Sequence, residues 1–322
     1  MRAYALRGRK NPQPNELLTG AEYASRYLEP LAQALGSVVQ TQTEVVAIGR
    51  EGTRKTEKIG APDRGETPFR LLLRTSHRER FEQADHVFDC SGTFSSPNPV
   101  GDGGLPAIGE AGCSGQISYG VVDAPRFDGK RLLVVGAGHS AATAVRDLVN
   151  AGAAVTWAVR HSDPQPCRRI PNDPLPERDR LSAEANALLG IVAYSPATTV
   201  QAVERTREGL RVSLQANGYA GDVLVDHIVA ATGFRPDLNL ARELQVQTCW
   251  ATEGTYKLAA ALLGETGGDC LAIPSFGADA LTHPEPGFYT LGMKSYGRTP
   301  AFLIRTGREQ IASVLAALAS RQ

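Results

Sequence analysis

The stretch from residue 130 to residue 160 constrains the fold of this chain more than any other part of the sequence. It begins with the apolar run Leu132–Val135, which has the length and β-branched composition of a buried parallel strand. A helical pattern follows over residues 140–150, and residues 154–159 have the composition of a second strand. The stretch therefore predicts one complete βαβ unit, with a glycine-rich turn after its first strand.

The residues of that turn suit the binding of a dinucleotide. Gly136 permits a tight turn, Gly138 lets backbone amides approach a pyrophosphate, and the small Ala141 lets helix and strand pack closely. His139 and Ser140 lie inside the same G-x-G-x-x-A loop. An ordinary structural turn is the alternative, but the strand before and the helix after favour dinucleotide binding. We assign all five residues to this site.

The end of the second predicted strand indicates which dinucleotide binds. An NAD site usually places Asp or Glu there to bind the ribose 2′-hydroxyl. This sequence has Arg160 and His161 instead. A carboxylate would repel a 2′-phosphate, whereas a guanidinium can bind it through two hydrogen bonds. We therefore expect NADP(H) rather than NAD(H), although a solvated Arg at a strand end is also common.

Composition narrows the class of protein. The chain has 322 residues, 42% of them hydrophobic, and Lys plus Arg equals Asp plus Glu at 34 each. This balance gives no indication of nucleic acid or an anionic membrane as a partner, and no apolar run is long enough to span a membrane. The five cysteines are scattered without C-x-x-C, and no His or Cys spacing predicts a metal site. We expect a cytoplasmic protein acting on a small-molecule substrate or electron acceptor.

The order of elements repeats along the chain. The first copy predicts a helix over residues 21–35, capped by Thr19 and with an apolar stripe expected in the core, then strands over 43–48, 69–75 and 86–89. The second copy predicts a helix over 182–189 and then strands over 198–204, 210–214 and 227–230. Such a repeat indicates two related nucleotide-binding modules. The fold class is therefore α/β with two Rossmann-like domains.

The first copy lacks a glycine-rich opening. No G-x-G-x-x-G precedes Gly136, and a βαβ unit needs roughly 30 or more residues. The first domain is therefore expected to be incomplete at its N-terminus. The apolar surface and strand edges that such a unit would cover should promote aggregation or homodimer formation.

Four motifs together resemble the flavoproteins with two dinucleotide-binding domains, among them the flavin-containing monooxygenases and the pyridine nucleotide-disulfide oxidoreductases. They are Ser91-Gly92-Thr93-Phe94-Ser95-x-Pro97, GAGHSA, Ala231-Thr232-Gly233-Phe234 and HPEPGFYTLGMKSYGRTPAFLIRTG. The resemblance implies a partial FAD-type domain over residues 1–125 and 240–322, interrupted by an NADP(H)-binding domain over 126–239. It implies NADPH-dependent oxidoreductase activity, with hydride passing from NADPH to FAD and on to oxygen or an organic acceptor.

The resemblance also implies further cofactor contacts. Gly92 and Thr93 would lie near the crossover of the flavin domain, and Thr232 and Gly233 at the equivalent turn near the nicotinamide nucleotide. A strand over 288–291 would lead into a loop beside the flavin ring, with contacts from Gly292, Met293, Tyr296 and Arg298. A helix starting at Thr299-Pro300 would direct its N-terminus at the flavin.

Three departures from the family pattern limit which properties of the family this chain is expected to share. The N-terminal FAD-binding G-x-G-x-x-G is absent, which puts FAD binding by this chain in doubt. The monooxygenase fingerprint F-x-G-x-x-x-H is degraded, with Cys113, Gly115 and Tyr119 at its defining positions. Met293 stands where the disulfide-reductase branch has Asp. No catalytic residue is singled out, and the main alternative is a non-catalytic NADP(H)-binding protein that has lost FAD binding.

Overall fold

The fold is described from a computed structural model, which places residues 16–173, 175–264 and 276–320. The chain divides into two compact units. One comprises residues 1–86 and 239–245, and the other comprises residues 87–238 and 246–322. The domain boundaries expected from the sequence stay a prediction.

The first unit begins with the predicted helix and its predicted cap. The Thr19 hydroxyl accepts a hydrogen bond from the Glu22 N–H at 3.2 Å, and the Glu22 carboxylate accepts one from the Thr19 N–H at 2.8 Å. The helix consists of α1 (Gly20–Tyr23), a π-helical turn (Ala24–Leu28) and α2 (Glu29–Leu35). The π turn ends two residues before Pro30, whose missing N–H interrupts the regular hydrogen-bond ladder. Pro30 is the only buried residue of this helix, so the expected apolar core stripe is wrong within this unit.

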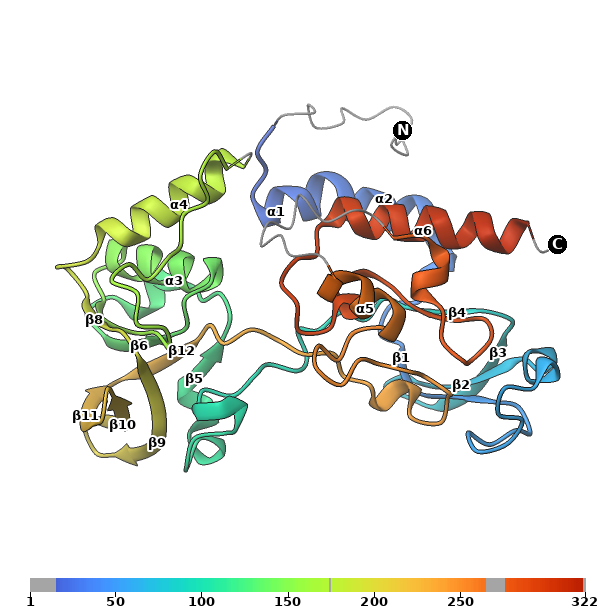
Figure 1. The fold of residues 1–322 in the computed structure, drawn as a ribbon, viewed down its shortest axis with the longest axis horizontal. Helices are drawn as coiled ribbons and strands as arrows, with labels where there is room; N and C mark the ends of the chain where they lie inside the picture. The colour runs from blue at the N-terminus through green and yellow to red at the C-terminus, as the bar shows by residue number, and fades with distance from the viewer. Residues whose placement is uncertain (1–15, 174, 265–275, 321–322) are drawn as a thin grey trace. The chain divides into compact units, whose positions relative to one another are not determined.

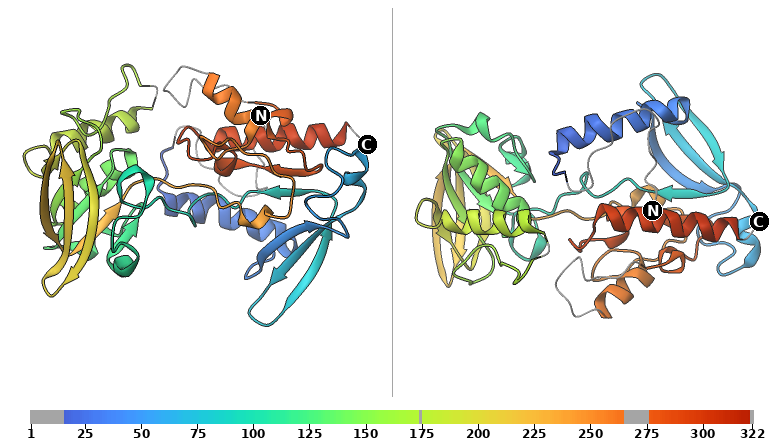
Figure 2. Two further views of the ribbon diagram at one scale, coloured as in Figure 1. Left: turned by 60° about the horizontal axis from the view of Figure 1, so that its bottom comes forward. Right: turned by 90° about the horizontal axis from the view of Figure 1, so that it is seen from above.

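A three-stranded antiparallel sheet completes the first unit. Its strands are β1 (Glu44–Arg50), β2 (Phe69–Arg74) and β3 (Glu79–Ala84), in the order β1-β2-β3. They form the twisted ribbon drawn in light blue in Figure 2. The sequence did not predict β3, whose residues are mostly polar. Pairing with β2 forms it, helped by the ion pair between Arg74 and Glu79 at 2.8 Å.

The second unit contains a five-stranded parallel sheet in the order β5-β12-β6-β7-β8. Two helices cover one face of this sheet and a three-stranded antiparallel sheet covers the other, which gives three layers (Figure 1). The parallel strands are β5 (Ile117–Tyr119), β6 (Arg131–Val135), β7 (Ala154–Ala158), β8 (Ala193–Ser195) and β12 (His227–Ala230). The covering elements are α3 (His139–Asn150), α4 (Pro176–Ala187), β9 (Thr198–Thr206), β10 (Gly209–Ala216) and β11 (Tyr219–Val225). The doubly covered sheet explains the continuous apolar runs of its strands.

Four elements of these layers depart from the expectation, and two of them, the three-residue strands β5 and β8, were simply not predicted. Helix α4 begins at Pro176 rather than at Ser182, because Pro is favoured in the first turn of a helix. Strand β11 was not predicted. It follows a turn in which Asn217 and Gly218 have φ of 43° and 84°, the conformation that Asn-Gly favours in a tight hairpin. That dipeptide was the available signal.

A second, two-stranded parallel sheet joins β4 (Val87–Asp89) to β13 (Phe288–Thr290). Helices α5 (Tyr256–Gly264) and α6 (Ile304–Ala319) belong to the same unit, and Tyr289, Leu291 and Val314 form part of its buried core. The expected helix start at Thr299-Pro300 is wrong, because α6 begins at Ile304 after a 3₁₀ turn over Gly292–Tyr296 and a short irregular stretch.

The structure shows the repeat in three dimensions. Sheets β1-β2-β3 and β9-β10-β11 are both antiparallel, and each is followed by a short strand of a parallel sheet, β4 or β12. The two copies differ in one respect. Strand β12 pairs on one side with the glycine-rich unit's β6, whereas β4 pairs only with β13 among the residues that the structure describes.

Candidate functional site

The turn after β6 has the geometry that its glycines predict. Gly136 has φ of 126°, and a Cβ added to it would lie 2.4 Å from the Ala231 carbonyl oxygen. Its own carbonyl accepts a hydrogen bond from Trp157 Nε1 on β7 at 2.8 Å. Only glycine fits this close approach between neighbouring strand ends. The first turn of the βαβ unit is therefore fixed by its surroundings.

Gly138 is different, because open space surrounds it. It is the N-cap residue of α3, with φ of −80° and ψ of 176°, and a Cβ added to it would meet no atom within 4 Å. No side chain caps α3. The N–H groups of its first turn thus have no side-chain acceptor, and they form the positive end of the helix dipole. Ser140 is exposed there, while Ala141 is buried against the sheet.

A charged pair not singled out from the sequence lies beside this loop. Asp173 accepts two hydrogen bonds from Arg178 on α4, both at 2.6 Å, and the Asp173 and Arg178 side chains are 1% and 13% exposed. Loss of water around His139 and the nearby Arg178 guanidinium lower the pKa of His139, against an opposing effect of Asp173. Both pKa-lowering effects favour the neutral form of the His139 imidazole. An Asp shortly before a helix start was the only sequence signal for the pair.

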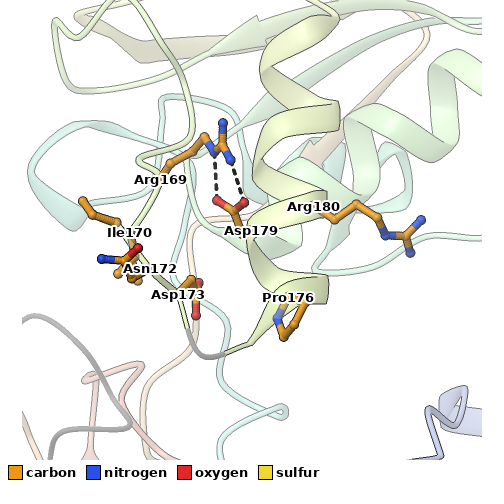
Figure 3. A pocket seen from close by; sticks show the side chains of 8 residues that line it. Arg169, Ile170, Asn172, Asp173, Pro176, Asp179 and Arg180 are labelled. Atoms are coloured by element: carbon orange, nitrogen blue, oxygen red, sulfur yellow. Dashed lines mark hydrogen bonds and ion pairs between the residues drawn. The ribbon is translucent and has the colours of Figure 1, made fainter.

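The basic residues at and after the end of β7 differ in whether other residues already bind them. Arg160 and Arg168 are exposed, and no hydrogen bond or ion pair joins either to a described residue. Arg169 is bound by Asp179 at 2.6 Å and lines an open pocket of about 490 Å³ (Figure 3). His161 contacts the Pro166 carbonyl through Nε2 at 3.1 Å. Arg160 lies two residues after the end of β7, and it is unpaired among the described residues.

The segment that follows the Gly92-Thr93 turn contacts the Thr232-Gly233 turn. Thr232 donates a hydrogen bond to the Asn98 carbonyl at 2.6 Å, and the Asn98 amide donates back to the Thr232 carbonyl at 3.1 Å. Gly92 and Gly233 have φ of 74° and 83°, which favours glycine at both turns. The Thr93 hydroxyl, almost fully buried, donates to Met293 Sδ at 3.1 Å.

The segment after β13 is fixed by several contacts. Gly292 has φ of 69°, and its N–H donates to the Gln310 side chain on α6 at 2.8 Å. Tyr296 is 1% exposed and packs edge-on against Phe302, and its burial raises the pKa of its hydroxyl. Arg298 is exposed. The structure thus gives Tyr296 a packing role, and the cofactor contacts of these residues stay predictions.

The degraded monooxygenase fingerprint has a local structural use. The Tyr119 hydroxyl donates to Glu110 at 2.8 Å, and burial followed by this hydrogen bond raises the pKa of Tyr119 to about 12. The buried Glu110 carboxylate also accepts hydrogen bonds from the N–H groups of Val100 and Ala107. Tyr119 therefore helps to satisfy a buried carboxylate, and Cys113 is buried in the same region.

The family model described as pyridine nucleotide-disulphide oxidoreductase matches residues 68–259, which is more than half of the chain. The chain belongs to this family. The match extends from β2 through the glycine-rich unit to α5. Oxidoreductases that use FAD and NAD(P) make up this family, in agreement with the resemblance seen in the motifs and with the α/β fold class expected from them.

A curated relative is similar to this chain over part of its length. The nitric oxide reductase FlRd-NAD(+) reductase of Klebsiella pneumoniae is 32% identical over 132 residues, which cover 41% of this chain and 33% of the relative. The chain thus aligns with about a third of the length of the curated relatives it matches.

Solved structures with a similar fold include a disulfide reductase and a hydroxylase. Bacillithiol disulfide reductase Bdr of Bacillus cereus matches with a TM-score of 0.70 and 16% identity, over 95% of this chain and 81% of that one. An ornithine N-hydroxylase of Kutzneria sp. 744, in a complex with reduced FAD, NADP+ and L-ornithine, matches with a TM-score of 0.59 and 16% identity, over 94% and 77%. At this identity the likeness concerns the fold alone. No helix in the described part of the chain could span a membrane.

Proposed function

We propose that this chain is an NADPH-dependent flavoprotein oxidoreductase acting on a small-molecule substrate or electron acceptor. The observation that carries the proposal is the uncapped N-terminus of α3 behind Gly136 and Gly138, in a chain of this family. Oriented N–H groups and open space at the second glycine suit a pyrophosphate. His139, Ser140 and Ala141 complete the loop.

Selectivity for NADPH is attributed to the strand end. Arg160 follows β7, where an NAD site usually has an acid, and His161 is next to it. Because Arg160 is not committed to another described residue, its guanidinium is available to a 2′-phosphate. Arg168 is a second available cation in the following loop, whereas the Asp179 carboxylate occupies Arg169.

The flavin is assigned to the edge formed by β4 and β13. Gly92, Thr93, Gly292, Met293 and Arg298 would line the ring side of that site. Thr255 supports a polar ligand there: its N–H donates to the Ser295 carbonyl at 3.0 Å, while its buried hydroxyl has no partner among described residues. A bound flavin would supply the redox chemistry by accepting hydride from NADPH and passing electrons to oxygen or an organic acceptor. The residues at this edge would hold and orient it.

A second candidate function is non-catalytic NADP(H) binding. The specific observation in its favour is the contrast between β12, which pairs with the glycine-rich β6, and β4, which has no such neighbour among described residues. The sequence likewise has no G-x-G-x-x-G before Gly136 to contact the pyrophosphate of FAD. This chain would then bind NADPH and hold FAD weakly.

One experiment separates the two candidates. The purified 322-residue chain is desalted, its absorbance spectrum is recorded, and it is titrated with NADPH and NADH. Flavin absorbance that persists, with consumption of NADPH, supports the oxidoreductase. A colourless protein that binds NADPH and stays colourless after addition of FAD and a second desalting supports the non-catalytic alternative. Equal affinity for NADPH and NADH contradicts the role given to Arg160.

A further inference from the structure

A buried charged cluster lies at the carboxyl ends of β4 and β13. Lys294 Nζ donates to Asp89 Oδ2 at 2.6 Å and to Ser91 Oγ at 3.0 Å. The side chains of Lys294 and Asp89 are each 2% exposed. The other Asp89 oxygen accepts hydrogen bonds from the Ser91 hydroxyl at 2.7 Å and the Ser91 N–H at 3.1 Å. One ion pair therefore connects two turns that are about two hundred residues apart in the sequence.

This cluster is costly to bury. Taking a carboxylate and an ammonium out of water carries a desolvation penalty that their attraction often fails to exceed. Asp89 lies on the same buried face of β4 as Val87, a position at which an apolar side chain would pack without that penalty. The pair is thus poorly explained by stability alone, which favours a role in arranging the surrounding turns.

The contacts around the cluster show what it arranges. On one side Asp89 holds the Ser91 backbone, next to Gly92 and Thr93. On the other side Lys294 lies within the 3₁₀ turn Gly292–Tyr296, which Gln310 of α6 also holds through Ser295 Oγ at 2.9 Å. An ammonium has three N–H donors, and the described residues accept two of them.

We propose that Lys294 is a positioning residue for the flavin, a role that rests on the proposed flavoprotein function. Held by Asp89 and Ser91, it fixes the turn over residues 91–93 and the turn over residues 292–296 in one arrangement. Both turns then present a preorganised surface to the ring, so that ordering them costs little when the flavin binds. In α/β sheets ligands bind outside the carboxyl ends of the strands, which is where these two turns lie.

The test uses the full chain with Lys294→Met, Asp89→Asn and the double variant. Removing one partner leaves an unpaired buried charge and lowers the Tm, whereas the double variant removes both charges and regains much of it. Lys257→Met is the matched control, because Lys257 forms an exposed ion pair with Asp279 at 3.1 Å in the same unit. Two readouts are measured: amide hydrogen exchange in residues 91–96 and 292–298, and the Kd for FAD from the quenching of its fluorescence.

We expect exchange to accelerate in both segments together, and the Kd for FAD to rise about tenfold or more, in all three cluster variants. The control should change neither. A double variant with parental exchange and parental FAD affinity would overturn the proposal, as would acceleration confined to one segment. If the parent chain binds no FAD, the flavin part of the proposed function fails. The exchange data then decide separately whether the cluster couples the two turns.

Discussion

Gly136 and Gly138 offer a paired test of the dinucleotide site, because the structure predicts opposite outcomes for them. At Gly138 the φ of −80° is accessible to any residue and no atom opposes a Cβ within 4 Å. Gly138→Val should therefore leave the fold intact and the Tm close to that of the parent chain. The added side chain lies where the backbone must approach the pyrophosphate, so the Kd for NADPH should rise by about 100-fold or more.

Gly136→Ala should instead damage the fold. Its φ of 126° is rarely adopted by residues with a Cβ, and that Cβ would lie 2.4 Å from the Ala231 carbonyl oxygen. Backbone strain of this kind costs about 1–3 kcal/mol, and the backbone overlap adds to it. For a chain of this size we expect the Tm to fall by roughly several degrees.

The assay combines thermal unfolding with the fluorescence of bound NADPH. Gly112→Ala is a suitable control, because Gly112 has no positive φ and no atom near the position of an added Cβ, and it lies outside the loop. If Gly138→Val binds NADPH with parental affinity, the loop is only a structural turn. If Gly136→Ala is as stable as the parent, the close approach to Ala231 is not a constraint and the reasoning fails.

Three further predictions follow from other parts of the structure. Arg160→Ala should remove a charge-assisted contact of about 1.5–3 kcal/mol to NADPH, which raises the Kd for NADPH by roughly 10- to 150-fold. The same variant should leave the affinity for NADH almost unchanged, and Arg211→Ala on β10 serves as the control. Equal losses of affinity for NADPH and NADH would contradict the role of Arg160 in binding the 2′-phosphate. Burial lowers the pKa of His283 in the folded chain to about 4. In the unfolded chain the His283 side chain has its ordinary pKa of about 6.5, so on acidification it binds a proton there before it does so in the folded chain. Stability should then be lost between about pH 6.5 and 4, by up to roughly 3 kcal/mol, and His283→Gln should flatten this dependence in urea unfolding; an unchanged slope argues against it. Fusing a glycine-rich βαβ unit of a relative ahead of Met1 should strengthen FAD binding, by pairing with β4 as β6 pairs with β12. A folded but colourless fusion would direct attention to residues 292–298.

Elements with a strong local signal were predictable from the sequence. The βαβ unit was predictable, because Leu132–Val135 is apolar throughout and the glycines mark its first turn. The Thr19–Glu22 capping box was also predicted, since the two residues interact within one turn of helix. Strands β3, β5, β8 and β11 were missed. The residues of β3 are largely polar, and pairing with β2 defines this strand. Strands β5 and β8 have three residues each, and the Asn-Gly hairpin signal before β11 was overlooked.

The sequence alone was enough to predict the class of this protein: an α/β chain with a repeated module, a glycine-rich loop after a buried strand, and Arg160 where an acid is usual. These features are local, and short-range sterics and charge specify them. Which residues meet depends on the three-dimensional fold. It separated Arg160 from the paired Arg169, buried Tyr296 in the core, and brought Asp89 and Lys294 within 2.6 Å. The Asp89–Lys294 pairing joins residues distant in the sequence, and the chain can only form it once parallel strands align their carboxyl ends at one edge.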